Sequence, residues 1–571
     1  MTRKNRKETQ PFQATVLEWL ILSAPYVIGV YHPWSAALVS TALLLLLSRT
    51  VRVQGCLKLS RSPVLLAAAA IPLFLLGGMI WGTDRGMALI GTVQFLPLPL
   101  YVLALEQCDV PARMPVLRRV PLSAAVMTLL SAVLSRIPAI RAAFVVNGRL
   151  AGFFQYPNSF ALFLLVGLVL LLFGKHEIGI GGNRTKRTLL LLVLLGGIAL
   201  SGSRAVLLIL LAVLVFYCLR GGEQGQRREG LLLLALMLIG GGAYTVLTGG
   251  TSAVGRMLSG PLIPSELLGR LLYARDALPV ILRHPLGLGY MGYAWLQGSF
   301  QTGVYTVGHV HNELLQLMLD AGWIPAALML WAVIHSLRCR DGSLCRKLVI
   351  LVIALHALLD FDTQYVALAL ILFTALDTDP AERTGPGPKL LLPTAVILAA
   401  LSLWVGAASF TFWRGNPSLA ARIYPAYTTA LTEHLQQTDG EEQAALADRV
   451  LSLCDHVAVA HAARAEAAMR EGDLEAALSE RRAVIRLAKY NLDAYLRYLD
   501  DLDLAMGVYR SRGDADAVKN CARQMTAVPG MLSAAEAETS ALGRRIRDLP
   551  ALDLPPEYRQ RITRASAGAA G

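Results

Sequence analysis

Two histidines and an asparagine precede a helix-forming apolar stretch in VGHVHNELLQLMLDAGWIP, residues 307–325. The apolar pattern predicts one helix over residues 313–334. An unperturbed imidazole titrates close to neutral pH, so His311 could take a proton from a hydroxyl or an amine. His309 could assist it, and Asn312 could orient the imidazole. The cluster therefore favours proton transfer, although a histidine beside a membrane is often only an interfacial polar residue.

Arginines form a second group of candidates: Arg149 in NGRLAGFFQYPNSFA, Arg204 in LSGSRAVLL, and Arg270 and Arg275 in GRLLYARDALPVIL. The planar guanidinium binds phosphate oxygens through paired hydrogen bonds and keeps its charge at low dielectric. Several arginines and a histidine on one face would suit a lipid-linked phosphate or diphosphate. The competing interpretation is that these side chains reach headgroup phosphates and only anchor helices.

The elements that must position these residues are predicted to be membrane helices. Hydrophobic residues make up 55% of the chain, charged residues make up 16%, and the mean hydropathy is +0.50. Apolar runs of about 20 residues, the length that crosses a bilayer, recur from about Thr15 to about Phe412. We expect an all-α polytopic bundle of about 12–13 spans, without a cleavable signal peptide.

Lysines and arginines in short loops predict the orientation of the bundle, because such loops are retained on the cytoplasmic side. The basic N-terminus, MTRKNRK, is expected to be cytoplasmic in a protein of the cytoplasmic membrane. The external loop 249–310 and everything after Arg414 are then outside. We interpret much of the net charge of +13 as a topological signal rather than a nucleic-acid footprint.

A change in composition near Arg414 predicts a membrane domain, residues 1–413, and a soluble helical domain, residues 414–571. Two Gly-Asp turns, at Gly472 and Gly513, each follow an amphipathic pattern. A repeated turn between amphipathic helices is typical of helical hairpin repeats, so the domain is expected to be tetratricopeptide-like. Because the spacing of the two turns is longer than the tetratricopeptide period of about 34 residues, an irregular helical bundle is the alternative. Cys454 and Cys521 could pair or stay as buried thiols, and no cysteine spacing is typical of a metal site.

The segment HNELLQLMLDAGWIP resembles the signature of the O-antigen ligase superfamily. His311-Asn312 and Gly322 fit it, whereas Pro325 stands where the family has a small or hydroxylated residue. SGSRAVLL, HPLGLG and GRLAGFFQYPNSFALFL are similar to further family motifs in the same order. The resemblance covers about residues 15–380.

This resemblance implies transfer of a glycan from a polyprenyl (undecaprenyl) diphosphate donor to an acceptor outside the membrane, with neither a cofactor nor a metal. His311 would be the base, Arg204 and Arg270 would hold the diphosphate, and Arg275 and Arg149 are weaker candidates. The partners would be the lipid-linked glycan, membrane lipids, and a glycan, lipid or protein acceptor. Ligation, chain polymerisation and transfer to protein hydroxyls all stay open.

A polytopic transporter or flippase for lipid-linked glycans is the alternative from a different class. Such a protein would favour ionisable groups near the bilayer midplane and internally repeated halves. Asp360 and Asp362 are the best candidates for that role, but they are expected at an external turn.

Overall fold

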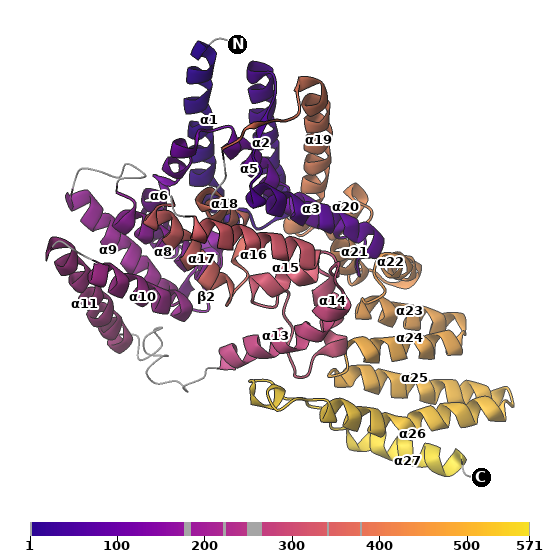
Figure 1. Cartoon of the computed structure of the whole chain (residues 1–571). Helices are drawn as coiled ribbons and strands as arrows, with labels where there is room; N and C mark the ends of the chain where they lie inside the picture. The colour runs from indigo at the N-terminus through magenta and orange to yellow at the C-terminus, as the bar shows by residue number, and fades with distance from the viewer. Residues whose placement is uncertain are drawn as a thin grey trace. The chain divides into compact units, whose positions relative to one another are not determined.

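The computed structural model describes residues 3–175, 184–220, 224–247, 265–339, 342–376 and 380–569. Most of these residues are in helices, and the strands among them are four two-residue segments (Figure 1). This confirms the predicted all-α class. Residues 249–264 of the expected external loop lie outside the described residues.

The helices up to residue 413 are, in chain order, α1 (Arg3–Ser23), α2 (Pro33–Gln54), α3 (Pro63–Trp81), α4 (Ala88–Phe95), α5 (Pro97–Glu106), α6 (Val120–Leu134), α7 (Arg141–Phe144), α8 (Pro157–Phe173), α9 (Arg184–Ser201), α10 (Arg204–Arg220), α11 (Gln224–Leu247), α13 (Ser265–Arg283), α14 (Gly292–Phe300), α15 (Glu313–Ala321), α16 (Trp323–Arg338), α17 (Leu344–Ala357), α18 (Val366–Ala375) and α19 (Pro388–Trp413). The helices that follow are α20 (Pro417–Ile423), α21 (Thr428–Leu435), α22 (Gly440–Leu453), α23 (Ala458–Glu471), α24 (Leu474–Leu487), α25 (Leu492–Ser511), α26 (Ala515–Ala537) and α27 (Pro556–Ala569).

Short 3-10 turns and two small strand pairs connect these helices. The turns are η1 (Ala24–Tyr26), η2 (Ile28–Val30), η3 (Val110–Ala112), η4 (Met114–Leu117), η5 (Pro138–Ile140), η6 (Gly152–Phe154), η7 (Asp362–Gln364) and η8 (Gly543–Arg545). Strand β1 (Lys58–Leu59) pairs antiparallel with β4 (Arg383–Thr384), and β2 (Val145–Val146) pairs antiparallel with β3 (Arg149–Leu150).

Several helices are suited to a membrane. Among the described residues, five helical segments are long and apolar enough to cross one: Pro33–Gln54, Pro63–Trp81, Ala88–Glu106, Val110–Leu134 and Pro388–Trp413. Three shorter apolar helices are α8, α16 and α18. The protein is therefore a helical membrane protein, while the expected 12–13 spans stay a prediction.

The chain divides into two compact units, each built from separate stretches of sequence. One contains described residues of 1–76, 89–264 and 311–410, and the other contains described residues of 77–88, 265–310 and 411–571. The predicted boundary near Arg414 stays a prediction.

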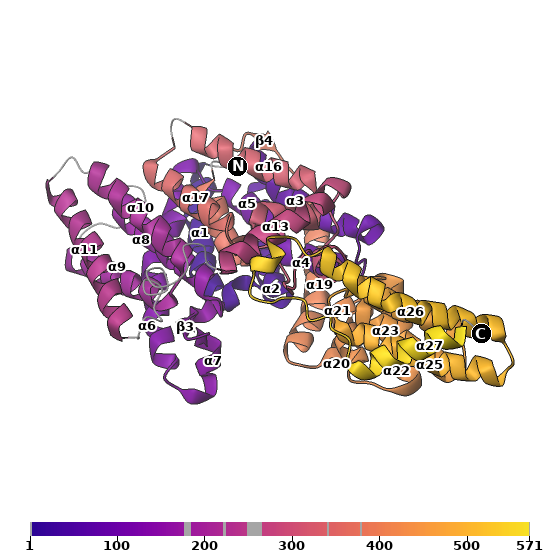
Figure 2. The same cartoon turned by 90° about the horizontal axis from the view of Figure 1, so that it is seen from below.

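Helices α8 and α18 form the centre of the first unit. Nearly every residue of α8 and every residue of α18 is buried, as expected for helices that are apolar all round. Helix α8 packs against α6, α9, α10 and α17, and both views show α8 to α11 side by side (Figures 1 and 2). This core fixes the N-terminal end of α8, where the candidate site is found.

The second unit contains the C-terminal helices, which stack in sequence from α22 to α27 (Figure 1). The predicted Gly-Asp turns are confirmed. Gly472 and Gly513 have positive φ values, and Asp473 and Asp514 then cap α24 and α26 by accepting from backbone N–H groups. Cys454 and Cys521 are buried thiols that do not form a disulfide. The likeness to tetratricopeptide repeats stays a prediction.

Candidate functional site

The start of α15 is fixed by Asn312. Its Oδ1 accepts from Leu315 N at 3.0 Å, and its Nδ2 donates to Leu358 O at 3.0 Å. Both bonds go to the backbone, so Asn312 acts on the chain beside His311 and not directly on the imidazole. His311 itself has a φ of 54°, a left-handed conformation that costs a histidine free energy and often marks a functional position.

Gly322 breaks the helix that the sequence predicts over residues 313–334. It has φ 87° and ψ −174°, a conformation essentially limited to glycine, and it separates α15 from α16. The expectation of one continuous helix was wrong. The apolar pattern of the sequence continues through Gly322 and therefore gives no sign of the break. Pro325 lies in the first turn of α16, where proline is tolerated.

Three consecutive residues tie the start of α15 to residues 358–363. His311 Nδ1 lies 3.2 Å from Asp360 Oδ1, Asn312 reaches Leu358 O, and Glu313 Oε2 accepts from Thr363 N at 3.1 Å. The His311 ring is also 5.1 Å from the Phe361 ring, centre to centre. These contacts hold the imidazole in one orientation against the turn.

Asp360 is fully buried and surrounded by donors. The Tyr156 hydroxyl donates to its two oxygens at 2.9 and 3.0 Å, and Asn158 Nδ2 donates to Oδ2 at 2.7 Å. Phe361 N donates to Oδ1 at 3.0 Å. Because these donors require an acceptor, the proton shared with His311 belongs on Nδ1. That tautomer leaves Nε2 of His311 as a proton acceptor.

Arg149 joins two further motifs to this cluster. Its Nη2 donates to Asn158 Oδ1 at 2.6 Å, and its Nε donates to Ser201 O at 2.7 Å. Ser201 ends α9, and Arg204 begins α10 directly after the tight turn. The guanidinium of Arg149 thus holds the start of α8 beside the turn that carries Arg204.

A second carboxylate reinforces the same turn. Asp362 Oδ1 accepts from Ser159 Oγ at 3.0 Å, and Asp362 Oδ2 lies 2.5 Å from His356 Nδ1. Ser159 and Asn158 are neighbours in α8, so consecutive residues bind the two aspartates. The turn is therefore anchored on both sides of Phe361, and Asp360 has little freedom to move away from His311.

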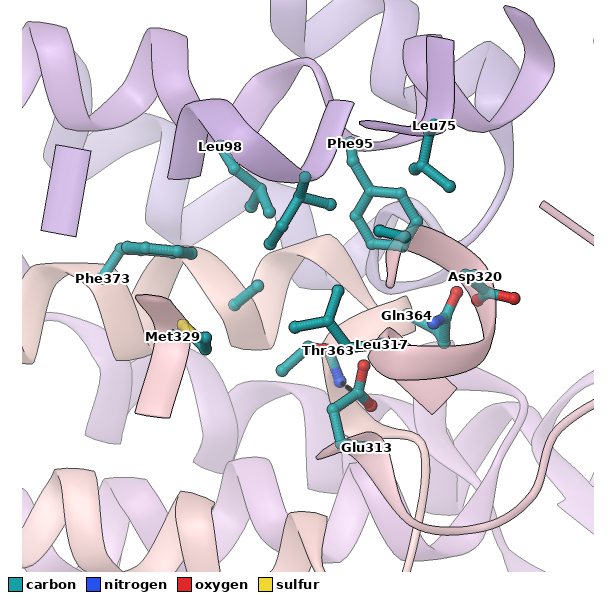
Figure 3. Close-up of a pocket in the computed structure, with 13 residues that line it drawn as sticks. Leu75, Phe95, Leu98, Glu313, Leu317, Asp320, Met329, Thr363, Gln364 and Phe373 are labelled. Atoms are coloured by element: carbon teal, nitrogen blue, oxygen red, sulfur yellow. Dashed lines mark hydrogen bonds between the residues drawn. The ribbon is translucent and has the colours of Figure 1, made fainter. Parts of the chain in front are cut away.

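A small cavity borders α15 (Figure 3). Its volume is about 40 Å³, and its polar lining comes from Glu313, Asp320, Thr363 and Gln364. It has room for a few water molecules, whereas ligand pockets usually measure about 300–1,000 Å³. This cavity is too small for a glycan. The His311 side chain is 20% exposed, so part of it is accessible from outside the protein.

The other predicted arginines belong to the second unit, on α13. Arg270 is partly exposed and Arg275 is exposed. Four leucines are exposed at helical spacing on the face that includes Arg275: Leu267, Leu271, Leu278 and Leu282. Such a stripe is typical of an amphipathic helix that lies on a membrane surface. His309, also in this unit, is partly buried.

Sequence reasoning did not assign Tyr156, Asn158 and Asp360 to this site. Asp360 was noticed only as a candidate for transport, and Asn158 only as part of a motif. The signal available was the pair of aspartates in a short connection between two apolar runs, since charged groups there need partners. The structure brings His311 and Arg149 into one hydrogen-bonded network with these residues, and Asn312 binds the backbone beside it.

One comparison with known proteins gives a match. Residues 189–332, about a quarter of the chain, match the family model for O-antigen ligase. The matched region runs from α9 to α16 and includes Arg204, Arg270 and His311, so the resemblance expected from the motifs is confirmed there. No match was found among curated proteins or among solved structures.

Proposed function

We propose that this chain, whose residues 189–332 match the family model for O-antigen ligase, is a membrane glycosyltransferase that transfers a glycan from a polyprenyl diphosphate to an acceptor. The reaction takes place on the outer face of the cytoplasmic membrane, with the N-terminus inside and the C-terminal helices outside. The observation that carries the proposal is the contact between His311 and the buried Asp360.

In this proposal His311 is the general base. Its Nε2 takes the proton of the acceptor hydroxyl or amine as that atom attacks the anomeric carbon of the donor sugar. The bond between that carbon and the diphosphate oxygen breaks, and the diphosphate leaves with the electron pair. Asp360 keeps the proton on Nδ1 and stabilises the imidazolium that forms, as carboxylates do in other histidine-based sites.

Arg204 and Arg270 stabilise the negative charge that grows on the leaving diphosphate. Preorganised cationic donors are suited to this role, because they need little reorganisation during the reaction. Arg275 assists them, and His309 contributes to the polar surroundings. Arg149 is a positioning residue in this scheme, since its guanidinium already binds Asn158 and Ser201.

The proposal is tested by envelope glycan analysis in the native host, with the wild-type gene, with a deletion, and with Asp360→Asn. Accumulation of full-length glycan on polyprenyl diphosphate in the deletion and in Asp360→Asn means ligation to a glycan, lipid or protein acceptor. Accumulation of single repeat units means polymerisation. Unchanged lipid-linked and envelope glycans in both strains would contradict transfer of either kind.

A further inference from the structure

Helix α13, which carries Arg270 and Arg275, is fixed through one buried carboxylate. Asp276 is 6% exposed and accepts three hydrogen bonds: from Thr302 N at 2.7 Å, from Thr302 Oγ1 at 2.7 Å and from the Tyr305 hydroxyl at 3.0 Å. Rotation of α13 about its axis would leave these donors buried without an acceptor, which is costly. The rotation of α13 is therefore set by residues 302–305.

Residues 302–303 are in turn held by the C-terminal part of the chain. Ser540 N donates to Thr302 O at 2.9 Å, Ser540 Oγ donates to the same oxygen at 3.2 Å, and Thr302 Oγ1 lies 3.0 Å from Ser540 Oγ. A Cβ on Gly543 would lie 2.1 Å from Thr302 O. The two backbones touch so closely that the segment has no room to shift without moving η8.

A second close contact joins α14 to the C-terminal helices. A Cβ added to Gly298 would lie 2.0 Å from Leu487 O at the end of α24. Buried Asp84 accepts from Trp295 Nε1 at 2.9 Å and from Thr428 Oγ1 at 2.7 Å, and so joins α14 to α21. The C-terminal helices thus contact both helices of residues 265–300 through close backbone approach and buried hydrogen bonds.

We infer that the C-terminal helices position α13 in cis, through the linkage Ser540, Thr302 and Asp276, so that its arginines face the donor diphosphate. The role of the arginines rests on the proposed function, whereas the linkage itself does not. Ser540, Thr302 and Asp276 are positioning residues, since they act through α13. If the C-terminal helices instead bound a macromolecular acceptor, changes in them would alter the KM for the acceptor and leave the KM for the donor unchanged.

The test compares full-length wild type in lipid nanodiscs with Ser540→Ala and with Thr302→Val, which keeps the side-chain shape but removes the hydroxyl. Ser511→Ala is the matched control, because its hydroxyl donates to Val508 O within its own turn. Ser540→Thr retains a hydroxyl and should restore wild-type behaviour. Two quantities are measured: amide hydrogen exchange of residues 265–283, and the KM values for polyprenyl diphosphate glycan and for acceptor.

Ser540→Ala and Thr302→Val should speed exchange in α13 and raise the donor KM about threefold to tenfold, the range that corresponds to loss of one net hydrogen bond. The acceptor KM should not change, and Ser511→Ala should match wild type in both readouts. Unchanged exchange in Ser540→Ala, or a change in the acceptor KM alone, would overturn the inference. Faster exchange in a protein whose wild type transfers no glycan would overturn the proposed function and leave the linkage standing.

Discussion

Replacing Asp360 by asparagine removes a charge while nearly preserving shape, and it should severely slow transfer. The new side chain would have one oxygen and one NH₂ group in a space where every neighbour donates. If the NH₂ faces His311, Nδ1 must accept, and the proton moves to Nε2, where it blocks the base. If the NH₂ faces Asn158 instead, two donors oppose each other.

The magnitude follows from the 3.2 Å contact between His311 Nδ1 and Asp360 Oδ1. At an effective dielectric constant of about 20, unit charges at that separation attract by about 5 kcal/mol. The imidazolium is only partly formed in the transition state, and a fifth of the His311 side chain is exposed, so about 3 to 5 kcal/mol of this stabilisation is relevant. Its loss corresponds to about a 10²- to 10⁴-fold slower reaction.

The assay is a single-turnover transfer with purified protein in nanodiscs, a defined polyprenyl diphosphate glycan, and acceptor isolated from the envelope of a deletion strain. Asp109→Asn is the control, because Asp109 is exposed before a short turn and makes no capping bond there. Donor binding should be similar in Asp360→Asn and wild type, since the lost interaction develops with proton transfer. A rate within threefold of wild type would refute the role of Asp360 as the partner of the base.

Three further outcomes are expected. Arg204→Lys and Arg270→Lys should each slow transfer about 30- to 1000-fold despite retained charge, because an ammonium cannot make paired contacts with phosphate; near-normal rates in both would mean that these arginines only anchor helices. Burial raises the pKa of Asp84 to about 6, so the folded protein binds this proton more tightly than the unfolded chain. The resulting stabilisation of the folded state is complete below about pH 4 and is lost as the pH rises through about 6. The melting temperature of wild type should therefore fall relative to Asp84→Asn between about pH 4 and pH 6, and parallel profiles would contradict this. Ser299→Cys, at an exposed position of α14, should react with a membrane-impermeant thiol reagent in intact cells; labelling only after lysis would reverse the proposed orientation.

Features that depend on neighbouring residues were predictable from the sequence. The Gly-Asp turns at Gly472 and Gly513 are local, because a left-handed glycine and a capping aspartate act within one turn. Helix α10 begins at Arg204, directly after the Ser-Gly-Ser turn, which is also a local feature. The polar cluster at His311 and Asn312 could be recognised because its members are adjacent.

Contacts between residues that are far apart in the sequence could not be predicted in this way. Asp360 is 49 residues from His311 and more than 200 from Tyr156 and Asn158, and no local pattern encodes those distances. The helix break at Gly322 was not predicted either, since glycine is tolerated within helices and only its backbone angles reveal the interruption. The union of residues 77–88, 265–310 and 411–571 in one unit likewise depends on packing.

The role of His311 as the base is tested most directly by the rate of glycan transfer by purified His311→Ala, measured beside His309→Ala and wild type with one defined polyprenyl diphosphate glycan. Wild type should form the transferred product, detected by mass spectrometry, and release polyprenyl diphosphate in equal amount. His311→Ala should lose about 10²- to 10⁴-fold, the usual contribution of a general base, and His309→Ala should lose much less. Near-wild-type transfer by His311→Ala would contradict the assignment of His311 as the general base.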